Sequence, residues 1–462
     1  MAKQNVDPTE QLAAQSQDAD ELPLFARDKS ERVRWAVAMN PHTPAAALAD
    51  LVRDVSERVA FEVFRNLSTP PEVLLARAGA PDPKLRFAIL NHPNTPPEAL
   101  ARLAASPLEG DYPQLTQKLA EHARTPGETL RTLAEKTHGD LRAVVAANPN
   151  APPDLLLLFA QERNPTSRSC VARNPSAPGE ALALLAGDRD LAVRREVALN
   201  CGTQLEALSR LAGDPDLAVR RHVALHGGTP LEALARLARD EHDEVRLEVA
   251  RNASISAELL STLTRDPDAW VRSAVAERAS ASAEELTYLA ADREARVRSA
   301  VAAHPRTPAA SLRILVEDKG PDVRCGLARN PSSSPELLAR LAPDRGQGIQ
   351  ESLAFNRNTP PEVLAQLAMD ADVAVRYAVA CNPSTPVAEL ERLADDHGVS
   401  YGGDREKWKL SLPERPQSEL SMGGSTSRGD ATNENPGKDF RPWPFRRRPA
   451  RCAWRPVGAH QR

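Results

Sequence analysis

The chain has 462 residues, enough for two or three ordinary domains or for one long array of repeats. Aromatic residues make up only 4% of it, and 40 prolines stand against 22 glycines, so an apolar core must rely on Leu, Ala and Val. No segment approaches 18 uninterrupted apolar residues, and the N-terminus lacks an apolar run of signal-peptide length. The five cysteines are scattered, with the closest two 31 residues apart, as expected for reduced thiols. We therefore predict a cytoplasmic protein without a transmembrane segment.

The N-terminal residues 1–21 are polar and rich in Gln and Asp, and we predict that they are disordered. Residues 22–32 resemble the second half of the repeat unit that follows them. We expect this segment to be an N-terminal half-repeat cap, because the ends of a repeat array need atypical covering units.

A period of 26 residues runs through the chain from residue 33 to about residue 400. A four-residue insertion around Glu109–Tyr112 interrupts the period once. The fourteen units begin at Val33, Val59, Leu85, Leu115, Leu141, Ser167, Val193, Val219, Val245, Val271, Val297, Val323, Ile349 and Val375. All of these first positions except Ser167 are aliphatic, so we expect them to lie in a shared core.

The idealised unit reads V-R-x-x-V-A-x-N-P-x-T-P-x-E-x-L-x-x-L-A-x-D. Apolar residues at positions one, five and six predict a short first helix, which we expect the Asn-Pro pair to end because Asn tolerates the left-handed conformation. The Thr-Pro-x-Glu segments, such as Thr69–Glu72, Thr95–Glu98 and Thr359–Glu362, predict a Thr N-cap and a capping box for a second helix. Leu at position sixteen is present in every unit. One unit cannot bury a core alone, so the pattern predicts an all-α solenoid over residues 22–400 with no β-sheet.

This pattern resembles that of the leucine-rich repeat variant family over nearly nine-tenths of the chain, in all fourteen units. The resemblance implies a right-handed superhelix in which α-helices alternate with short 3₁₀ helices. It implies interaction modules rather than a defined activity. Some members carry an iron–sulfur centre on an N-terminal cysteine cluster, but no Cys precedes Cys170 here, so we expect no cofactor and no metal.

Arginine occupies position two in eleven units and usually follows an Asp by six residues. One interpretation is a row of phosphate-binding arginines that follows nucleic acid. We favour an Asp–Arg ladder that is structural, since a phosphate-binding row should not bring a counter-charge at fixed register. The predicted ladder residues are Asp188, Arg194, Asp214, Arg220, Asp240, Arg246, Asp266, Arg272, Asp292, Arg298, Asp318, Arg324, Asp370 and Arg376.

His222 and His226 are four residues apart, a spacing that can chelate zinc on a helix. No third ligand accompanies them, and His226 falls at the Asn position of its unit, so we interpret it as a substitute for Asn. The cysteines occupy unrelated positions without a recognisable base, and no phosphate-binding or nucleophile-elbow motif is present. We therefore predict no catalytic site and no enzymatic activity.

Positions three and seven vary most between units and share one face of the first helix, where we expect a partner to bind. In the first three units this face reads Trp35, Met39, Phe61, Arg65, Phe87 and Asn91. Aligned aromatic residues in a chain with few of them are typical of a binding hot spot. The alternative is that these rings fill space beneath the N-terminal cap.

Residues 401–462 carry thirteen Lys and Arg against seven Asp and Glu, so this tail is +6 and the remaining 400 residues are −10. We predict a disordered tail whose Trp443, Arg446, Arg447, Arg448 and Trp454 suit an anionic surface, nucleic acid included. A tail without a role and a tail that folds back on the acidic solenoid are the alternatives.

The leading hypothesis is a monomeric, non-catalytic scaffold that binds a protein or peptide through the solenoid surface. The alternative is a nucleic-acid-binding solenoid of the HEAT kind, in one version acting on DNA bases. The acidic balance of the solenoid disfavours nucleic acid there.

Overall fold

The computed structural model describes residues 8–105, 113–136, 139–346, 348–394 and 396. These residues contain thirty α-helices and no strand, which confirms the all-α solenoid. The helices α1 and α2 precede the repeats, and each of the fourteen units then contributes one odd-numbered and one even-numbered helix. The predicted insertion near residue 110 and the basic tail lie outside the described residues.

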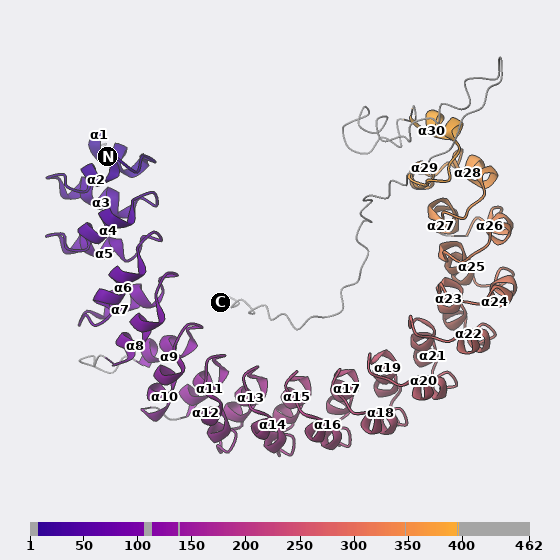
Figure 1. The fold of residues 1–462 in the computed structure, drawn as a ribbon, viewed down its shortest axis with the longest axis horizontal. Helices are drawn as coiled ribbons and strands as arrows, with labels where there is room; N and C mark the ends of the chain where they lie inside the picture. The colour runs from indigo at the N-terminus through magenta and orange to yellow at the C-terminus, as the bar shows by residue number, and fades with distance from the viewer. Residues whose placement is uncertain (1–7, 106–112, 137–138, 347, 395, 397–462) are drawn as a thin grey trace, which may run out of the picture. The chain divides into compact units, whose positions relative to one another are not determined.

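The odd-numbered helices, which are the first helices of the units from α3 onward, are α1 (Pro8–Gln15), α3 (Glu31–Met39), α5 (Glu57–Val63), α7 (Pro83–Leu90), α9 (Pro113–Glu121), α11 (Asp140–Ala147), α13 (Pro165–Arg173), α15 (Leu191–Leu199), α17 (Leu217–Leu225), α19 (Asp243–Arg251), α21 (Ala269–Ala276), α23 (Ala295–Ala303), α25 (Pro321–Arg329), α27 (Ile349–Phe355) and α29 (Val373–Ala380). The even-numbered helices are α2 (Leu22–Phe25), α4 (Ala45–Leu51), α6 (Pro71–Arg77), α8 (Pro97–Ala105), α10 (Gly127–Glu135), α12 (Pro153–Phe159), α14 (Gly179–Leu185), α16 (Leu205–Leu211), α18 (Leu231–Leu237), α20 (Ala257–Leu263), α22 (Ala283–Leu289), α24 (Ala309–Leu315), α26 (Pro335–Leu341), α28 (Pro361–Leu367) and α30 (Val387–Ala394). Within the repeat array, the odd-numbered helices from α11 to α27 lie along the inner side of the row of units, and the even-numbered helices lie along the outer side (Figure 1).

Two details of this architecture differ from the expectations. The N-terminus is not disordered through residue 21, because α1 is helical and packs on α3 with Ala13 fully buried. The second helices are α-helices, mostly of seven residues, rather than the 3₁₀ helices that the family resemblance implies; the described residues contain no 3₁₀ helix.

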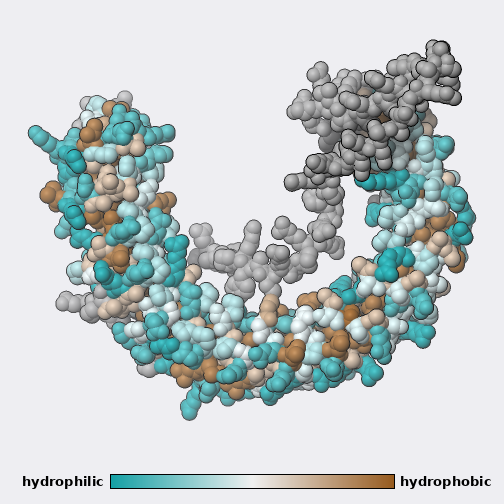
Figure 2. All heavy atoms as spheres, viewed as in Figure 1, coloured by the Kyte–Doolittle hydropathy of each residue, from teal (hydrophilic) through white to brown (hydrophobic). Residues whose placement is uncertain are grey.

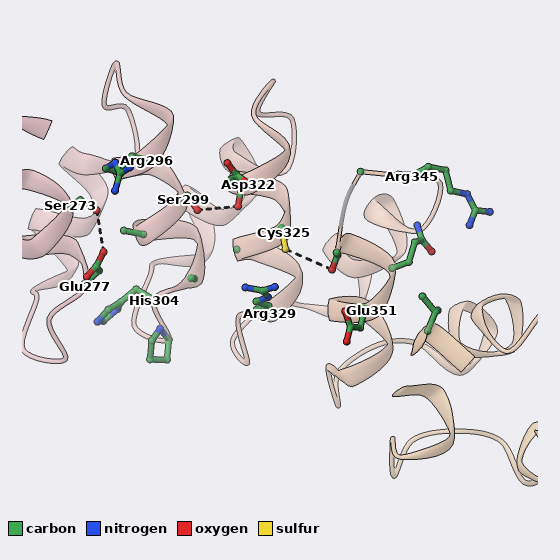
Figure 3. Close-up of a pocket in the computed structure, with 18 of the residues that line it drawn as sticks. Ser273, Glu277, Arg296, Ser299, His304, Asp322, Cys325, Arg329, Arg345 and Glu351 are labelled. Atoms are coloured by element: carbon green, nitrogen blue, oxygen red, sulfur yellow. Dashed lines mark hydrogen bonds between the residues drawn. The ribbon is translucent and has the colours of Figure 1, made fainter. Parts of the chain in front are cut away.

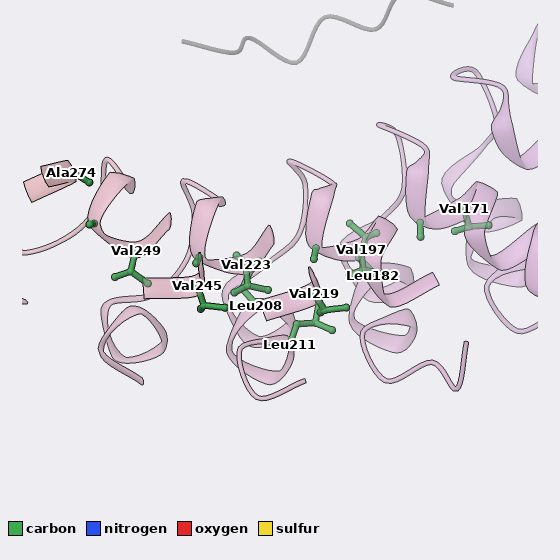
Figure 4. Close-up of a cluster of buried hydrophobic side chains, with 14 of the residues drawn as sticks. Val171, Leu182, Val197, Leu208, Leu211, Val219, Val223, Val245, Val249 and Ala274 are labelled. Atoms are coloured by element: carbon green, nitrogen blue, oxygen red, sulfur yellow. The ribbon is translucent and has the colours of Figure 1, made fainter. Parts of the chain in front are cut away.

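The core is a continuous line of aliphatic side chains between the two rows of helices. Positions one and five of the first helices gather with positions sixteen and nineteen of the second helices, as Val219, Val223, Leu208 and Leu211 do with at most 1% exposure each (Figure 4). The periodicity predicted these positions because residues four apart share one face of a helix. On the molecular surface, hydrophobic residues appear in separate groups rather than as one continuous patch (Figure 2).

The Asn at position eight joins each unit to the preceding one. Asn200 Nδ2 donates to Ala172 O at 2.7 Å and to Asn174 O at 2.9 Å, while its Oδ1 accepts from the backbone N–H of Gly202. The same pair of bonds, to carbonyls 28 and 26 residues earlier, is made by Asn66, Asn148, Asn174, Asn252, Asn330, Asn356 and Asn382. The predicted left-handed conformation is wrong, since Asn200 is extended at φ −74°. Asn suits this position because its amide satisfies buried backbone carbonyls.

The Thr of the Thr-Pro segment does not cap the second helix as predicted. Thr359 Oγ1 donates back to Leu353 O at 2.6 Å, and α28 begins after Pro360 with no side-chain cap. A capping box occurs in α22, where Ser282 and Glu285 exchange side-chain and backbone bonds. The hydroxyl of Thr therefore stabilises the turn between the helices by adding a second bond to a carbonyl in the last turn of the first helix, which also accepts from the backbone N–H of Asn356.

Candidate functional site: a groove on the inner face

We call the surface formed by positions three, four and seven of the first helices the inner face. A groove of about 1200 Å³ lies on this face across α21, α23, α25, α27 and α29 (Figure 3). Its lining includes Ser273, Glu277, Arg296, Ser299, Ala300, Ala303, His304, Asp322, Cys325, Gly326, Arg329, Arg345, Gln350, Glu351, Asp370 and Asp372. Most of these residues come from equivalent positions of consecutive units, because the repeat places positions three and seven on the side of the helix away from the core.

The groove is hollow because its floor carries small side chains. Position three is Ser273, Ser299 and Cys325 in three successive units, where the first three units have Trp or Phe. Gly326 follows Cys325, and a Cβ at Gly326 would lie only 2.8 Å from the backbone oxygen of Ser299. The helices α23 and α25 can approach this closely only with a glycine at that point. The six residues predicted to bind a partner lie at the other end of the array, and the small residues aligned at one offset are the sequence signal for this groove.

Carboxylates and guanidinium groups surround this floor. Glu277 accepts from Ser273 Oγ at 3.2 Å, and Arg329 Nε donates to Ser352 Oγ at 3.1 Å. Arg296 stacks on Trp270 with its guanidinium carbon 3.1 Å from the ring centroid. The lining holds five Asp and Glu side chains against three Arg, so it is weakly acidic.

The predicted Asp–Arg ladder is present, but each Arg pairs with a carboxylate of its own unit, and its bond to a backbone oxygen is what reaches the preceding unit. Each ladder Arg pairs with the Asp 20 residues later, as Arg220 Nε does with Asp240 Oδ2 at 2.6 Å, and its Nη1 donates to the backbone oxygen of the Asp six residues earlier. The pairs in the described residues are Arg34–Asp54, Arg168–Asp188, Arg194–Asp214, Arg220–Asp240, Arg246–Asp266, Arg272–Asp292, Arg298–Asp318, Arg324–Asp344 and Arg376–Asp396, with Arg142–Glu162 as a variant. The earlier Asp thus supplies a carbonyl to its Arg, not a carboxylate. These guanidinium groups are occupied within the stack.

The ladder shifts the pKa of several of its carboxyl groups. The hydrogen bond from Arg298 lowers the pKa of Asp318 below its usual range despite partial burial, and the backbone N–H of Gly320 adds to that effect. The hydrogen bond from Arg324 likewise lowers the pKa of Asp344. For Asp240, burial raises the pKa, but the bonds from Arg220 and from the backbone of His242 outweigh it, and the pKa is lowered. The ladder therefore favours the charged carboxylates.

The ladder is interrupted at position two of the unit that begins at Ile349. Gln350 stands there, and its Nε2 donates to Ala342 O at 3.2 Å and to Asp344 O. Its Oε1 is buried and has no hydrogen-bond partner. Asp370, which a ladder Arg would reach, is paired instead with Arg345 at 2.9 Å.

The six residues predicted to bind a partner lie on α3, α5 and α7 or directly after them. Trp35 packs against the core beneath Arg58, whose guanidinium carbon is 4.3 Å from the ring centroid, and Phe87 also packs against the core. Phe61 is half-buried, and the position-seven residues of the same units, Met39, Arg65 and Asn91, are exposed. The aromatic rings thus contribute to packing, while the exposed residues are accessible to a partner.

His226 behaves as the predicted substitute for Asn. Its Nε2 lies 3.1 Å from Asn200 O, and its Nδ1 accepts from the backbone of Gly228. Both ring nitrogens are engaged, so His226 and His222 do not form a metal-binding pair. Burial lowers the pKa of His222, aided by the nearby Arg221 and Arg195.

The tail residues Trp443, Arg446, Arg447, Arg448 and Trp454 lie outside the described residues. Among the helices that are described, none is long and apolar enough to cross a membrane.

The paired helices, the continuous core and the bonds between units define an α-solenoid repeat protein. Residues 114–169, which hold the units that begin at Leu115 and Leu141, match the family profile described as the leucine-rich repeat variant domain. The pattern of these two units recurs along the array, so the other units are similar to leucine-rich repeat variant repeats as well.

The solved structures that are similar to this chain include the following three. One, titled as a leucine-rich repeat variant with a novel repetitive structural motif, is 27% identical over 49% of this chain and 87% of that one, with a TM-score of 0.34. An engineered protein is 17% identical over 83% and 99%, with a TM-score of 0.19. A chain in a structure of the Pds5–Scc1 complex is 13% identical over 85% and 68%, with a TM-score of 0.24. No curated protein matches the sequence.

Proposed function

We propose that the solenoid is a non-catalytic scaffold that binds an extended segment of a partner protein along its inner face. The groove across α21–α29 supports this proposal more than any other observation. Its volume of about 1200 Å³ exceeds the range of a typical small-molecule pocket, which is roughly 300–1,000 Å³. An open, polar groove that spans five units suits a chain several residues long.

Exposed aromatic residues continue this face toward the C-terminal end of the array. Phe355 is 52% exposed and Tyr377 is 42% exposed, on α27 and α29. Exposed aromatic side chains beside a polar groove are typical of the residues that dominate binding energy. Met39, Arg65 and Asn91 at the other end of the inner face are a second proposed contact region, with Trp35, Phe61 and Phe87 beneath them.

The charges of the inner face give no support to the nucleic-acid alternative. At positions three and seven, Arg65, Arg173, Arg195 and Arg251 are each within 4 Å of a carboxylate. Among the described residues at these positions, two arginines, Arg221 and Arg329, have no ion pair, and two glutamates, Glu277 and Glu351, have none either. A phosphate-binding surface needs more unpaired cations than unpaired anions, and equal numbers of the two do not provide that excess.

A matched pair of substitutions tests the proposed surface. Ala303 lies at position seven in the groove, and Ala339 lies on the outer helix α26; both are exposed. We expect dodecamer peptides selected from a random library on the full chain to bind Ala303→Arg at least about tenfold more weakly, and Ala339→Arg unchanged. Fluorescence anisotropy of the labelled peptides measures both. Equal binding to the two variants would overturn the proposal for this groove.

A further inference from the structure

The place where Gln350 replaces a ladder Arg borders the groove. Gln350, Asp370 and Arg345 all line it, so the place of the missing guanidinium is part of the same hollow as the proposed binding surface. In every intact Arg–Asp pair of the ladder, the guanidinium group of position two contacts the Asp of its own unit and a backbone oxygen of the preceding unit. Position two of this unit is Gln350, which has no guanidinium group to pair with Asp370.

The orientation of the Gln350 amide follows from its neighbours. Its Nε2 faces two backbone oxygens, those of Ala342 and Asp344, so a flipped amide would bring Oε1 against two acceptors. The oxygen Oε1 is therefore left as a buried acceptor without a donor, on a residue that is only 8% exposed. A buried acceptor in this state is destabilising, and a donor that reaches it relieves that cost.

The carboxylate across the gap is paired with an exposed cation. Asp370 has 14% of its side chain exposed, within the 4–25% found for the carboxylates of the intact Arg–Asp pairs. Its cation is Arg345, whose own side chain is 73% exposed. An exposed ion pair contributes little, so Arg345 can leave Asp370 at small cost when a better-placed cation arrives.

We propose that this gap is an arginine-binding subsite, in which the guanidinium of a bound partner takes the place of the missing ladder Arg. The partner's guanidinium would donate to the Asp370 carboxylate and to Gln350 Oε1, after a small shift that exposes that oxygen. The subsite rests on the proposed function and specifies the partner: an extended segment with an arginine side chain directed toward α27 and α29.

The acceptors at the subsite distinguish arginine from other side chains. A guanidinium has five donors in a planar fork and can engage a carboxylate and an amide oxygen together, whereas an ammonium is a compact point charge. Glu351 and Asp372 line the same part of the groove and have no ion pair among the described residues, so an anionic side chain is repelled there. The negative charge around the gap therefore favours a cation, and the two separate acceptors favour the planar guanidinium of arginine over an ammonium group.

The test uses the full chain and three labelled nonapeptides of Gly and Ser with one central residue, which is Arg, Lys or citrulline. We expect the Arg peptide to bind wild type at least about fivefold more tightly than the other two, as a bidentate charged contact requires. The variant Gln350→Arg supplies the missing guanidinium from the chain itself. We therefore expect it to bind the Arg peptide at least about tenfold more weakly than wild type and to have a higher thermal unfolding midpoint.

The control variant is Gln366→Arg, the same chemical change at an exposed position of the outer helix α28. It leaves Arg-peptide binding unchanged if the gap is the site, since it adds the same charge elsewhere. The second variant, Gln350→Leu, removes the acceptor without filling the gap with charge, and an intermediate loss of affinity is expected for it.

Three results would overturn the subsite: undetectable binding of the Arg peptide, equal affinity for the Arg and Lys peptides, or equal affinity of wild type and Gln350→Arg. Library peptides that depend on Ala303 but not on Gln350 would keep the proposed function and refute the arginine subsite alone. Library peptides that depend on neither residue would refute both.

Discussion

Ser167 is the one polar residue at position one of the fourteen units, and it lies fully buried in the core. Its hydroxyl has no hydrogen-bond partner. Replacing it with Val should stabilise the array by about 1–3 kcal/mol, because an unsatisfied hydroxyl is removed and apolar area is buried. Urea denaturation of the full chain measures this, with Ser261→Val on the exposed face of α20 as the control. An unchanged or lower midpoint would show that the hydroxyl has an unseen partner.

At the scale of single residues, the repeat predicted which side chains are structural but not which atoms they contact. An Asp six residues before one Arg is also the Asp 20 residues after the Arg of the preceding unit, because the two spacings add up to the period of 26. The sequence pattern therefore cannot tell a pair within a unit from a pair between units. The Asn at position eight is similar: its partners are backbone carbonyls of the preceding unit, which no sequence pattern displays.

At the scale of helices, the alternation of two short helices and the core positions were predictable, because the apolar spacing sets both. The groove was not predicted, since its depth depends on how closely α23 and α25 approach. That approach depends on one glycine, Gly326, whose neighbours are visible only in three dimensions. The most distinctive sequence pattern at these positions is Trp35, Phe61 and Phe87 in the first three units, which indicates the other end of the inner face.

The close approach of α23 and α25 leads to a prediction for Gly326→Ala. In an open helix this change would stabilise by about 1 kcal/mol through helix propensity. Here the new methyl group would lie 2.8 Å from Ser299 O and 3.3 Å from Ala302 Cβ, so the helices must separate. We expect a net destabilisation of about 1–3 kcal/mol in urea denaturation, together with weaker binding of groove peptides.

A matched control for Gly326 is Gly227→Ala, where a Cβ would meet nothing within 4 Å. That variant should be neutral or slightly stabilising, because alanine restricts the unfolded chain. If both variants leave stability and peptide binding unchanged, the close packing of α23 on α25 does not form the floor of the groove.

At the scale of the whole molecule, the array is held by the same set of contacts repeated between neighbours. Each junction combines aliphatic packing with, in most units, an Asn amide on two carbonyls of the preceding unit and a ladder Arg that pairs with the Asp of its own unit and donates to a carbonyl of the preceding one. A repeat array has a stability that is approximately the sum of such junctions, so a condition that affects every pair at once acts on the entire chain. Acid is such a condition.

The direction of the acid effect follows from the lowered pKa values of Asp318 and Asp344. A carboxyl group whose folded pKa lies below its unfolded value stabilises the fold above the unfolded pKa, which is about 3.9. That contribution is lost as the pH falls through the folded pKa. We therefore expect the urea midpoint to change little from pH 7 to pH 5 and to fall steeply below about pH 4.

One ladder carboxylate can be separated from the rest by comparing two Asp→Asn variants. Asp318→Asn leaves Arg298 without its charged partner, so it should lower stability at pH 7 by about 1–3 kcal/mol and reduce the loss of stability between pH 5 and pH 3. Asp154→Asn removes an exposed carboxylate, 66% accessible in its pair with Arg131, and should leave stability nearly unchanged. Urea titrations of both variants at pH 7, 5 and 3 measure this difference. Identical pH profiles for the two variants would mean that the ladder does not set the acid sensitivity of the array.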